Sequence, residues 1–548
     1  MLSKKTNSFS SFSNLLHLPS FALIIGYIIY WFEIYFFKKG QGLSSPLATC
    51  LLAVLAIYLF FGQRKLFFSA VDWCIKEYKQ ESKIRKAVIL LACCIVFLIL
   101  LTTFFALLLP PHLAQEFDAL NYHLTLPRQH LILGSFSHIH WSAADLFPLP
   151  IQFALAPYWL IKEIPSKFIH ILFVFGLLAI SLNLIRCFSN NNFLSLFIGL
   201  MAILGSHNVG IQIPILMLDI VICYLFLASI DSFLEGKIIL GSIELSFFIW
   251  SKSFVPFQML AILTIIFLIG LLLKKLGANN RSWVFEKTSY DKLLSRKYLK
   301  KSVLYLFLSS MLVGGPFMAK SLLKSGTPLF PFSPGLLKTS SVDQKTPHWR
   351  SIVASSERHF STKDAYGSGR SILEFLRHLW LIAVPEDQTT NRYDYPLGLP
   401  YLLFLAPFIY FVFISFKKKQ LVLLPLFAVS FWMLWWFGSQ QARFLYIPLL
   451  IIFISVAAKI KQPRNSFIYA LVIALLFNFI SIFRAHSGDL FKPSVKVLRT
   501  KDKQLIEMNK KYRDRSSLSP VVLDYYDVAY ANFPLKIVGK NRFWVLEE

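Results

Sequence analysis

The chain has 548 residues, of which 56% are hydrophobic and only 16% are charged. A soluble protein of this length carries about a quarter charged residues, so the composition excludes an ordinary soluble domain. The formal net charge is +27, but the basic residues are scattered over separate connections, which argues against a nucleic-acid-binding protein. The sequence therefore indicates a polytopic membrane protein, whose membrane-embedded backbone must be helical.

Taken in chain order, the apolar runs predict thirteen transmembrane helices, each long enough to cross a bilayer at about 1.5 Å per residue. They lie near residues 21–37, 47–62, 87–109, 168–187, 193–210, 211–229, 238–251, 254–273, 302–319, 398–416, 420–437, 443–459 and 466–483. The first run follows polar residues and lacks a small-residue cleavage site, so we interpret it as an anchor rather than a signal peptide.

Lysine and arginine set the predicted orientation. The basic connections at 62–86, 274–301, 417–419 and 459–464 are expected to be cytoplasmic by the positive-inside rule. Thirteen spans place all of them on one side. A fourteenth span at the apolar segment 150–161 would break this agreement, so we predict that segment to be a non-spanning helix at the membrane edge.

The chain then divides into five predicted regions. These are an N-terminal anchor with two extra spans and a basic cytoplasmic loop (1–86), a transmembrane module (87–319) that contains a first extracytoplasmic loop (110–167), a second extracytoplasmic loop (320–397), the C-terminal transmembrane helices (398–484) and an extracytoplasmic tail (485–548). Alternating apolar residues in the tail predict two or three short strands, a small β or α/β cap. An amphipathic stretch at 371–384 could lie on the membrane surface.

The first extracytoplasmic loop concentrates ionisable side chains. Pro110 and Pro111 end the preceding span, and Asp118 stands where a new helix begins. Asp118 suits a helix N-cap. It equally suits a general base, because partial desolvation at the membrane surface would raise its pKa toward a useful value. Glu116 is the second candidate base, and both interpretations of Asp118 stay open.

The same loop raises the question of a metal ion. Its histidines are His123, His130, His138 and His140. His138 and His140 form an H-x-H pair, which the carboxylates of Glu116, Asp118 and Asp145 could complete. No compact spacing of a known zinc site is present, so we predict no metal ligands here and keep a divalent ion only as an alternative.

The segment "FDALNYHLTLPRQHLILGSF" resembles the first-loop motif of GT-C-type integral-membrane glycosyltransferases, in the bacterial branch related to protein mannosyltransferases and the lipid A aminoarabinose transferase. That motif reads roughly W-D-A-L-x-Y-H-L-x-x-P-K-x-Y-x-x-x-G. The matching positions are Asp118, Ala119, Leu120, Tyr122, His123, Leu124, Pro127 and Gly134. Arg128 stands in place of the Lys, and Phe117 in place of the aromatic residue before the Asp.

Further segments are similar to the same family in the same order, over residues 87–460. They are "LFPLPIQFALAPYWLIKEIPSKFIHILFVFGLL", "IPILMLDIVICYLFLA", "FFIWSKSFVPF", "GGPFMAKSLLKSGTPLFPF" and "SQQARFLYIPLL". Two departures concern the fourth segment. Lys320-Ser321 replaces an Arg-Asn pair, and Thr327 replaces an Asn, so substrate contacts at these positions are expected to differ.

The resemblance implies an enzyme that takes a sugar from a polyprenyl-phosphate carrier and transfers it, usually with inversion, to an acceptor at the extracytoplasmic face. The acceptor would be a glycan, a lipid or a protein. Asp118 and Glu116 are the predicted catalytic residues. The predicted substrate-binding residues are Tyr122, His123, Arg128, Asp219, Lys252, Lys320 and Arg443. The predicted location is the bacterial inner membrane, with the site facing the periplasm.

Cations at predicted outer ends of spans are the candidates for binding the phosphate. A charged side chain in mid-bilayer costs about 2.5–3.5 kcal/mol, so Lys252 either snorkels to the interface or has a ligand. Arg443 has the same placement, and it or Arg128 could bind phosphate oxygens bidentately. Asp219 falls about eight residues into the span 211–229 and therefore needs a partner, with Lys252 and Arg443 as the candidates.

Two other functions compete with the transferase. A transporter or flippase for lipid-linked glycans should have inverted repeats and matching broken helices, and we see neither in the sequence. An O-antigen ligase or polymerase would have its key residues in a late large loop, such as 320–397. The carboxylates of the first loop favour the transferase. Glu244, another acid within an apolar run, has no predicted role.

Overall fold

The computed structural model describes residues 13–36, 44–107, 118–139, 142–159, 167–189, 192–275, 296–335, 347–361, 366–367, 369–384, 396–418, 422–460 and 462–490, and the single positions 393, 503, 507 and 510. Within these residues the chain is helical and contains no β-strand. The strands predicted for the C-terminal tail lie outside the described residues, as does Glu116.

The N-terminal half contains α1 (Ser13–Leu16), α2 (Leu18–Phe36), α3 (Ser44–Gln80), α4 (Lys83–Leu107), η3 (Ala119–His123), α5 (Thr125–Leu133), η4 (Ala143–Leu146), α6 (Pro150–Trp159), α7 (Phe168–Ser189), α8 (Phe193–Leu204), α9 (His207–Gln212), α10 (Asp219–Leu234), α11 (Ile238–Ile249) and α12 (Val255–Lys275). The C-terminal half contains α14 (Arg296–Ser325), α15 (Pro347–Ser361), α16 (Ile372–Leu381), α17 (Leu399–Lys417), α18 (Leu423–Phe437), η7 (Ala442–Leu445), α19 (Tyr446–Lys459) and α20 (Asn465–Leu490).

Nine stretches of helix in the described part of the chain are long and apolar enough to cross a membrane. They lie in α2, α3, α4, α7, α12, α14, α17, α20 and the continuous η7–α19 unit, and each coincides with a predicted span. The other four predicted spans fall on shorter helices, namely α8, α10, α11 and α18, and on the six-residue α9. The structure therefore supports an all-helical multi-pass membrane protein, while the count of thirteen stays a prediction.

Two helix boundaries differ from those predicted. The basic connection 62–86 is largely helical, because α3 continues to Gln80 through a stretch without proline. The span predicted at 211–229 is interrupted between Gln212 and Asp219. Pro214 lies in this break, and a proline has no backbone N–H with which to continue a helix. Asp219 is therefore the first residue of α10, and its predicted depth of eight residues within a helix is wrong.

The centre of the fold consists of two nearly fully buried helices, α10 and α19. Every residue of α19 from Tyr446 to Ala458 is buried, and α10 is buried along most of its length. These two helices pack against α7, α8, α11 and α18. At one close approach, a Cβ on Gly199 of α8 would stand 2.3 Å from Cδ1 of Ile185, so a larger residue there would require the Ile185 side chain to shift.

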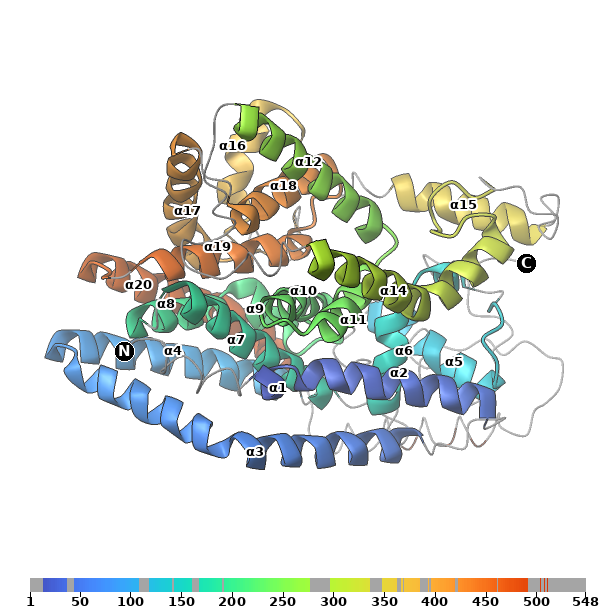
Figure 1. The fold of residues 1–548 in the computed structure, drawn as a ribbon, viewed down its shortest axis with the longest axis horizontal. Helices are drawn as coiled ribbons and strands as arrows, with labels where there is room; N and C mark the ends of the chain where they lie inside the picture. The colour runs from blue at the N-terminus through green and yellow to red at the C-terminus, as the bar shows by residue number, and fades with distance from the viewer. Residues whose placement is uncertain are drawn as a thin grey trace.

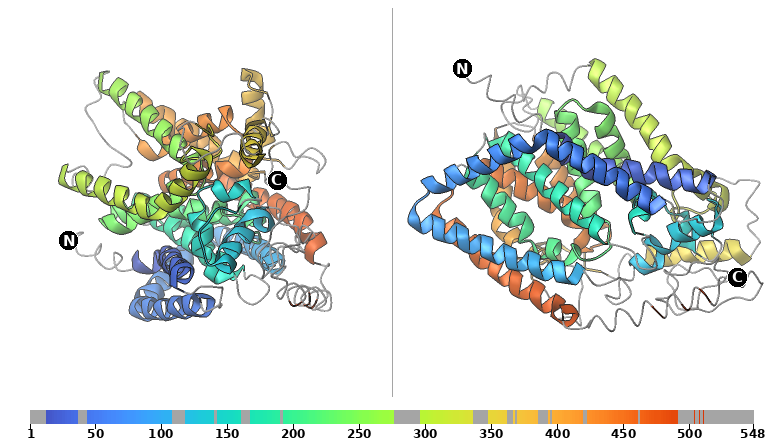
Figure 2. Two further views of the ribbon diagram at one scale, coloured as in Figure 1. Left: turned by 90° about the vertical axis from the view of Figure 1, so that its right-hand side faces the viewer. Right: turned by 90° about the horizontal axis from the view of Figure 1, so that it is seen from below.

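The outer helices present apolar side chains to their surroundings. Val54 of α3, Phe267 of α12 and Leu312 of α14 are all more than 60% exposed, which is the pattern of lipid-facing surface rather than of a water-soluble protein. α2, α3, α4, α19 and α20 run along the long axis of the molecule (Figure 1). α5, α6 and α15 gather at one end of this axis, and the turn between α3 and α4 lies at the other, as the view from below also shows (Figure 2).

The first loop begins with the helical turn η3, in agreement with the predicted helix start at Asp118. η3 is a five-residue π-type turn closed by the Leu124 N–H, which donates to the Ala119 carbonyl over 2.9 Å. Pro127 does not interrupt the following helix α5, because it falls in the first turn, where the backbone N–H groups have no helical partner. Gly134, at φ 60°, ends α5 in a left-handed cap.

Candidate active site

Four charged side chains from separate parts of the chain meet in two neighbouring ion pairs. Arg443 Nη1 donates to Asp118 Oδ2 over 3.1 Å. Lys252 Nζ donates to Asp219 Oδ1 over 2.9 Å. Arg443 Nη1 also lies 3.4 Å from the sulfur of Met217, two residues before Asp219, which places the two pairs side by side. The sequence-based candidates for base, phosphate ligand and partner acid therefore come together.

Each of these residues lies at a helix end. Asp118 precedes η3, Arg443 lies in η7 before α19, and Lys252 lies in the turn between α11 and α12. Asp219 begins α10, where the positive end of the helix dipole favours its carboxylate. The Arg443 guanidinium is further oriented by Gln441, whose Oε1 accepts from Arg443 Nε over 3.0 Å. Helix ends thus bring the charges together while the apolar helix bodies stay in the core.

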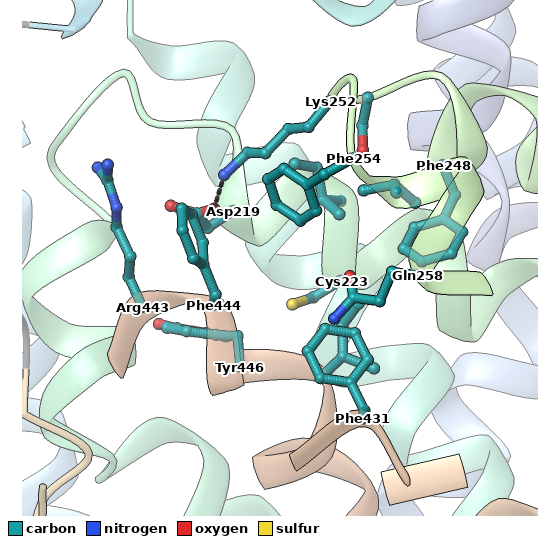
Figure 3. A pocket seen from close by; sticks show the side chains of 14 residues that line it. Asp219, Cys223, Phe248, Lys252, Phe254, Gln258, Phe431, Arg443, Phe444 and Tyr446 are labelled. Atoms are coloured by element: carbon teal, nitrogen blue, oxygen red, sulfur yellow. Dashed lines mark hydrogen bonds and ion pairs between the residues drawn. The ribbon is translucent and has the colours of Figure 1, made fainter. Parts of the chain in front are cut away.

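One aromatic ring links the two cations (Figure 3). Lys252 Nζ lies 4.2 Å from the ring centroid of Phe444, and the guanidinium carbon of Arg443 lies 5.3 Å from it. Phe254 packs against the same ring, with the two centroids 5.6 Å apart. Cation–π contact of this kind holds a cation at a fixed place without neutralising it. The ring therefore helps to hold both cations beside their carboxylates.

A pocket with about 380 Å³ of space between its walls, part of it open to the outside, lies next to the ion pairs. Asp219, Lys252 and Arg443 form one end of it, and most of the remaining lining is aromatic and aliphatic, with Cys223, Ser251 and Gln258 among it (Figure 3). The pocket combines a charged end with an apolar wall, which suits an amphiphilic ligand.

Several pocket residues were not predicted from the sequence. The aromatic lining includes Phe248, Phe431, Phe444 and Tyr446. The chain contains 54 Phe and 22 Tyr residues, so an aromatic residue alone carries no signal for a site. Only adjacency to Arg443 could have indicated Phe444 and Tyr446.

The environment of Asp118 lowers its proton affinity. Burial alone would raise the pKa of Asp118, but Arg443, His123 and Lys252 together hold it below its usual value. This direction is opposite to the predicted one, because desolvation is outweighed by nearby positive charge. The Asp118 side chain is 18% exposed and makes no helix-capping hydrogen bond. Asp118 thus stands at the predicted N-cap position of η3, but its carboxylate pairs with Arg443 instead of capping a backbone N–H.

His123 and Tyr122 complete the surroundings of Asp118. Burial lowers the pKa of His123 to about 4, against the opposing effect of Asp118, so this imidazole is neutral at pH 7. Its Nδ1 lies 3.1 Å from Gln152 Nε2, and because the amide nitrogen is the donor, the proton of His123 lies on Nε2. The ring of Tyr122 packs against that of His123, with the centroids 4.2 Å apart and the planes tilted by 54°, and burial raises the pKa of Tyr122 well above its usual value.

Lys320 belongs to a different cluster. Its Nζ donates to Asp145 Oδ1 over 2.8 Å and lies 4.1 Å from the ring centroid of Phe136. His130 Nε2 contacts the same oxygen at 2.7 Å, and the Ile139 N–H donates to the other oxygen over 2.8 Å. The cluster ties the first loop to α14, so the expected contact of Lys320 with substrate is not supported.

This buried cluster also answers the question of a metal in the first loop. His138, one member of the H-x-H pair, does have its Nδ1 3.2 Å from Asp145 Oδ2, as a metal site built from that pair and Asp145 would require. However, the ammonium of Lys320 already neutralises that carboxylate. Burial would raise the pKa of Asp145, but Lys320 and His130 hold it well below its usual range.

His140 lies outside the described residues, and Arg128 is buried on α5.

Comparisons with protein-family models, with curated proteins and with solved structures give no match for this chain. The fold and the site define an all-helical membrane protein with a paired-charge pocket between its central helices. The likeness to GT-C enzymes rests on the sequence segments themselves, and the function is argued below from the side chains of the site.

Proposed function

We propose that the protein is a membrane glycosyltransferase that moves a sugar from a polyprenyl-phosphate carrier to an acceptor hydroxyl at the extracytoplasmic face. The observation that carries this proposal is the pairing of Asp118 with Arg443 beside the pairing of Asp219 with Lys252, at one end of an apolar pocket. Three separate segments that resemble the GT-C family supply one residue each to the two pairs, in addition to the first loop. Chance convergence of four such residues would be unusual.

The reaction requires a base, positive charge and a place for the lipid. The Asp118 carboxylate takes the proton of the acceptor hydroxyl as the acceptor oxygen forms a bond to the anomeric carbon. The bond between that carbon and the phosphate oxygen breaks, and its electron pair leaves on the carrier phosphate. Attack from the face opposite the leaving group inverts the anomeric centre. Lys252 and Arg443 stabilise the negative charge that develops on the phosphate.

The ion pairs suggest how the donor activates its own site. Without donor, Asp118 is neutralised by Arg443 and is a weak base because its pKa is low. The phosphate of an incoming donor competes for the same guanidinium. Once Arg443 turns to the phosphate, the pKa of Asp118 rises, because a positive neighbour is replaced by an anion. The base thus gains proton affinity only when a donor is bound.

The apolar part of the pocket suits the lipid. It lies beside α12 and α18, and α12 exposes Leu263 and Phe267 to its surroundings. An isoprenoid chain could therefore stay in the bilayer next to α12 while its phosphate reaches Lys252.

The proposal is tested with the full chain in lipid nanodiscs. A panel of short-chain polyprenyl-phosphate hexoses and pentoses is supplied with a cell-envelope extract as the source of acceptor, and release of polyprenyl phosphate is measured by mass spectrometry. Asp118→Asn keeps the shape of the side chain and removes the base, so transfer should fall by about 10²–10⁴-fold. Glu374→Gln, at an exposed ion pair on α16, is the matched control and should leave transfer unchanged.

Equal transfer by Asp118→Asn and the control, at equal protein levels, would contradict the proposal. The same assay separates the competing functions. A transporter would move the labelled carrier across the membrane without releasing polyprenyl phosphate. An O-antigen ligase or polymerase would leave these monophosphate donors intact and use diphosphate-linked oligosaccharides instead.

A further inference from the structure

A second group of ionisable side chains lies at the other end of α10. His17, in the turn between α1 and α2, meets Asp231 in the last turns of α10 and Glu235 just after that helix. One potential ligand atom from each of these three residues lies within 4.8 Å of the other two. His17 and Asp231 are buried, whereas Glu235 is exposed. The group is thus closed on the protein side and open on one side.

Two atoms of this group are buried without a hydrogen-bond partner. His17 Nε2 and Asp231 Oδ2 face each other at 3.4 Å, which is within ion-pair distance if the imidazole is protonated, but they form no hydrogen bond. Two ligands of a tetrahedral zinc ion, each about 2.0–2.1 Å from the metal, lie about 3.4 Å apart. The separation of Nε2 and Oδ2 is therefore that of two atoms that bind one ion. Buried polar atoms without partners are rare and call for such an explanation.

The surrounding residues orient these two atoms. His17 Nδ1 contacts Glu244 Oε1 at 2.8 Å, which directs the lone pair of Nε2 toward Asp231. Asn183 Nδ2 donates to Asp231 Oδ1 over 2.7 Å and leaves Oδ2 available. A histidine held by a carboxylate on its far nitrogen is the usual support of a metal-binding imidazole. Glu244, which has no role in the sequence analysis, thereby acquires one.

The support extends to Glu244 itself. Its two oxygens accept from the hydroxyls of Ser20 and Ser232, over 2.5 and 2.7 Å. The carboxylate is therefore fixed by residues of α2, α10 and the α1–α2 turn and does not need to bind the ion directly. Such a braced outer shell is expected around a metal ligand.

We propose that His17, Asp231 and Glu235 bind a divalent transition-metal ion of the zinc type. One imidazole and two carboxylates are a donor set that zinc accepts, and an imidazole disfavours magnesium and calcium. Glu235 now pairs with Lys237, whose Nζ lies 3.0 Å from Glu235 Oε2, so the ion would displace that ammonium from the carboxylate. The bound ion would tie the start of α2 to the end of α10, far from the pocket, and this inference does not depend on the proposed transferase activity.

The test uses the full chain, with any affinity tag removed, in detergent micelles stripped with EDTA. Zn²⁺ is then added, its stoichiometry is measured by elemental mass spectrometry, and Co²⁺ is used as a spectroscopic probe of tetrahedral binding. The wild type should retain one Zn²⁺ per chain with a raised unfolding temperature. Glu235→Gln should weaken Zn²⁺ binding at least about tenfold, and its exposed position keeps the fold intact. Glu81→Gln, a carboxylate paired with Arg85 elsewhere, should bind Zn²⁺ like the wild type.

A second variant addresses the buried ligand. Asp231→Asn preserves the size of the side chain and an oxygen for Asn183, and it should abolish both Zn²⁺ retention and the shift in unfolding temperature. The competing arrangement is a protonated His17 held between Asp231 and Glu244 without metal. Failure of the wild type to retain Zn²⁺, or equal Zn²⁺ affinity in the wild type and Glu235→Gln, would establish that arrangement and overturn the metal site.

Discussion

Two clusters of oppositely charged side chains lie near the first loop. They differ in how fully their carboxylates are hydrogen-bonded and in how deeply they are buried. In the buried cluster around Asp145, both carboxylate oxygens receive donors and Asp145 is 0% exposed. In the paired-charge site, Asp118 and Lys252 are 18% and 27% exposed and the pairs border a pocket. A buried cluster whose polar atoms all have partners holds helices and loops together. Charged side chains that can exchange partners can instead bind a ligand.

The difference predicts that removing a carboxylate lowers the stability of the protein much more in the buried cluster than in the paired-charge site. Asp145→Asn leaves the Lys320 ammonium buried without its counter-ion, so the protein should lose about 3–5 kcal/mol of stability, the usual effect of breaking a buried ion pair. Asp118→Asn should cost less, because its partner Arg443 is partly exposed and has a second polar neighbour in Gln441. Thermal unfolding in detergent measures both. Equal destabilisation by the two variants would erase the distinction between the clusters.

The role of Arg443 is tested by Arg443→Gln. Loss of the guanidinium removes a stabilising contact to the phosphate and should lower sugar transfer by about 10²–10³-fold. It also raises the pKa of Asp118, since Arg443 is the strongest of the positive neighbours that lower it. A base works only when ionised, so the acid limb of the activity–pH profile should move to higher pH. Arg377→Gln on the exposed face of α16 is the control, and an unshifted acid limb would speak against Asp118 as the base.

His123 makes stability depend on pH. Its folded pKa is about 4, whereas the pKa in the unfolded chain is about 6.5. Between these values the unfolded state binds the extra proton, so stability falls as the pH falls from about 6.5 toward 4, by about 1 kcal/mol per pH unit. His123→Gln should flatten this slope in unfolding temperatures measured at several pH values. A slope that the substitution leaves unchanged would place the proton uptake elsewhere.

The smallest expected effect concerns the ring between the two cations. Phe444→Leu keeps an apolar side chain but removes the cation–π contacts to Lys252 and Arg443. At about 0.5–1 kcal/mol, donor binding should weaken about two- to fivefold with little change in stability. Binding of undecaprenyl phosphate measured by native mass spectrometry reports this. Phe483→Leu, on the exposed face of α20, is the matched control, and a similar loss there would indicate a general lipid effect.

The sequence predicts those features that depend on local composition. Apolar length alone predicts the nine long membrane helices. An acid in an apolar run demands a cation, and Lys252 was one of two candidates for Asp219. The pairing of Asp118 with Arg443 was not predictable, because it joins residues 325 positions apart and depends on how η7 packs. Lys320 and Lys252 look alike in sequence. Only the structure shows that Lys320 pairs with the buried Asp145, whereas Lys252 pairs with Asp219 beside the pocket.

The length of α10 has a consequence for access to the site. Its sixteen residues rise by about 24 Å, which is less than the hydrocarbon thickness of about 30 Å. If α10 crosses the bilayer, a polar group at Asp219 lies below the level of the surrounding headgroups. Under the proposed activity, the head of the carrier lipid would then meet Lys252 and Asp219 at the level of the hydrocarbon layer, and the hydrophilic acceptor would have to descend to it.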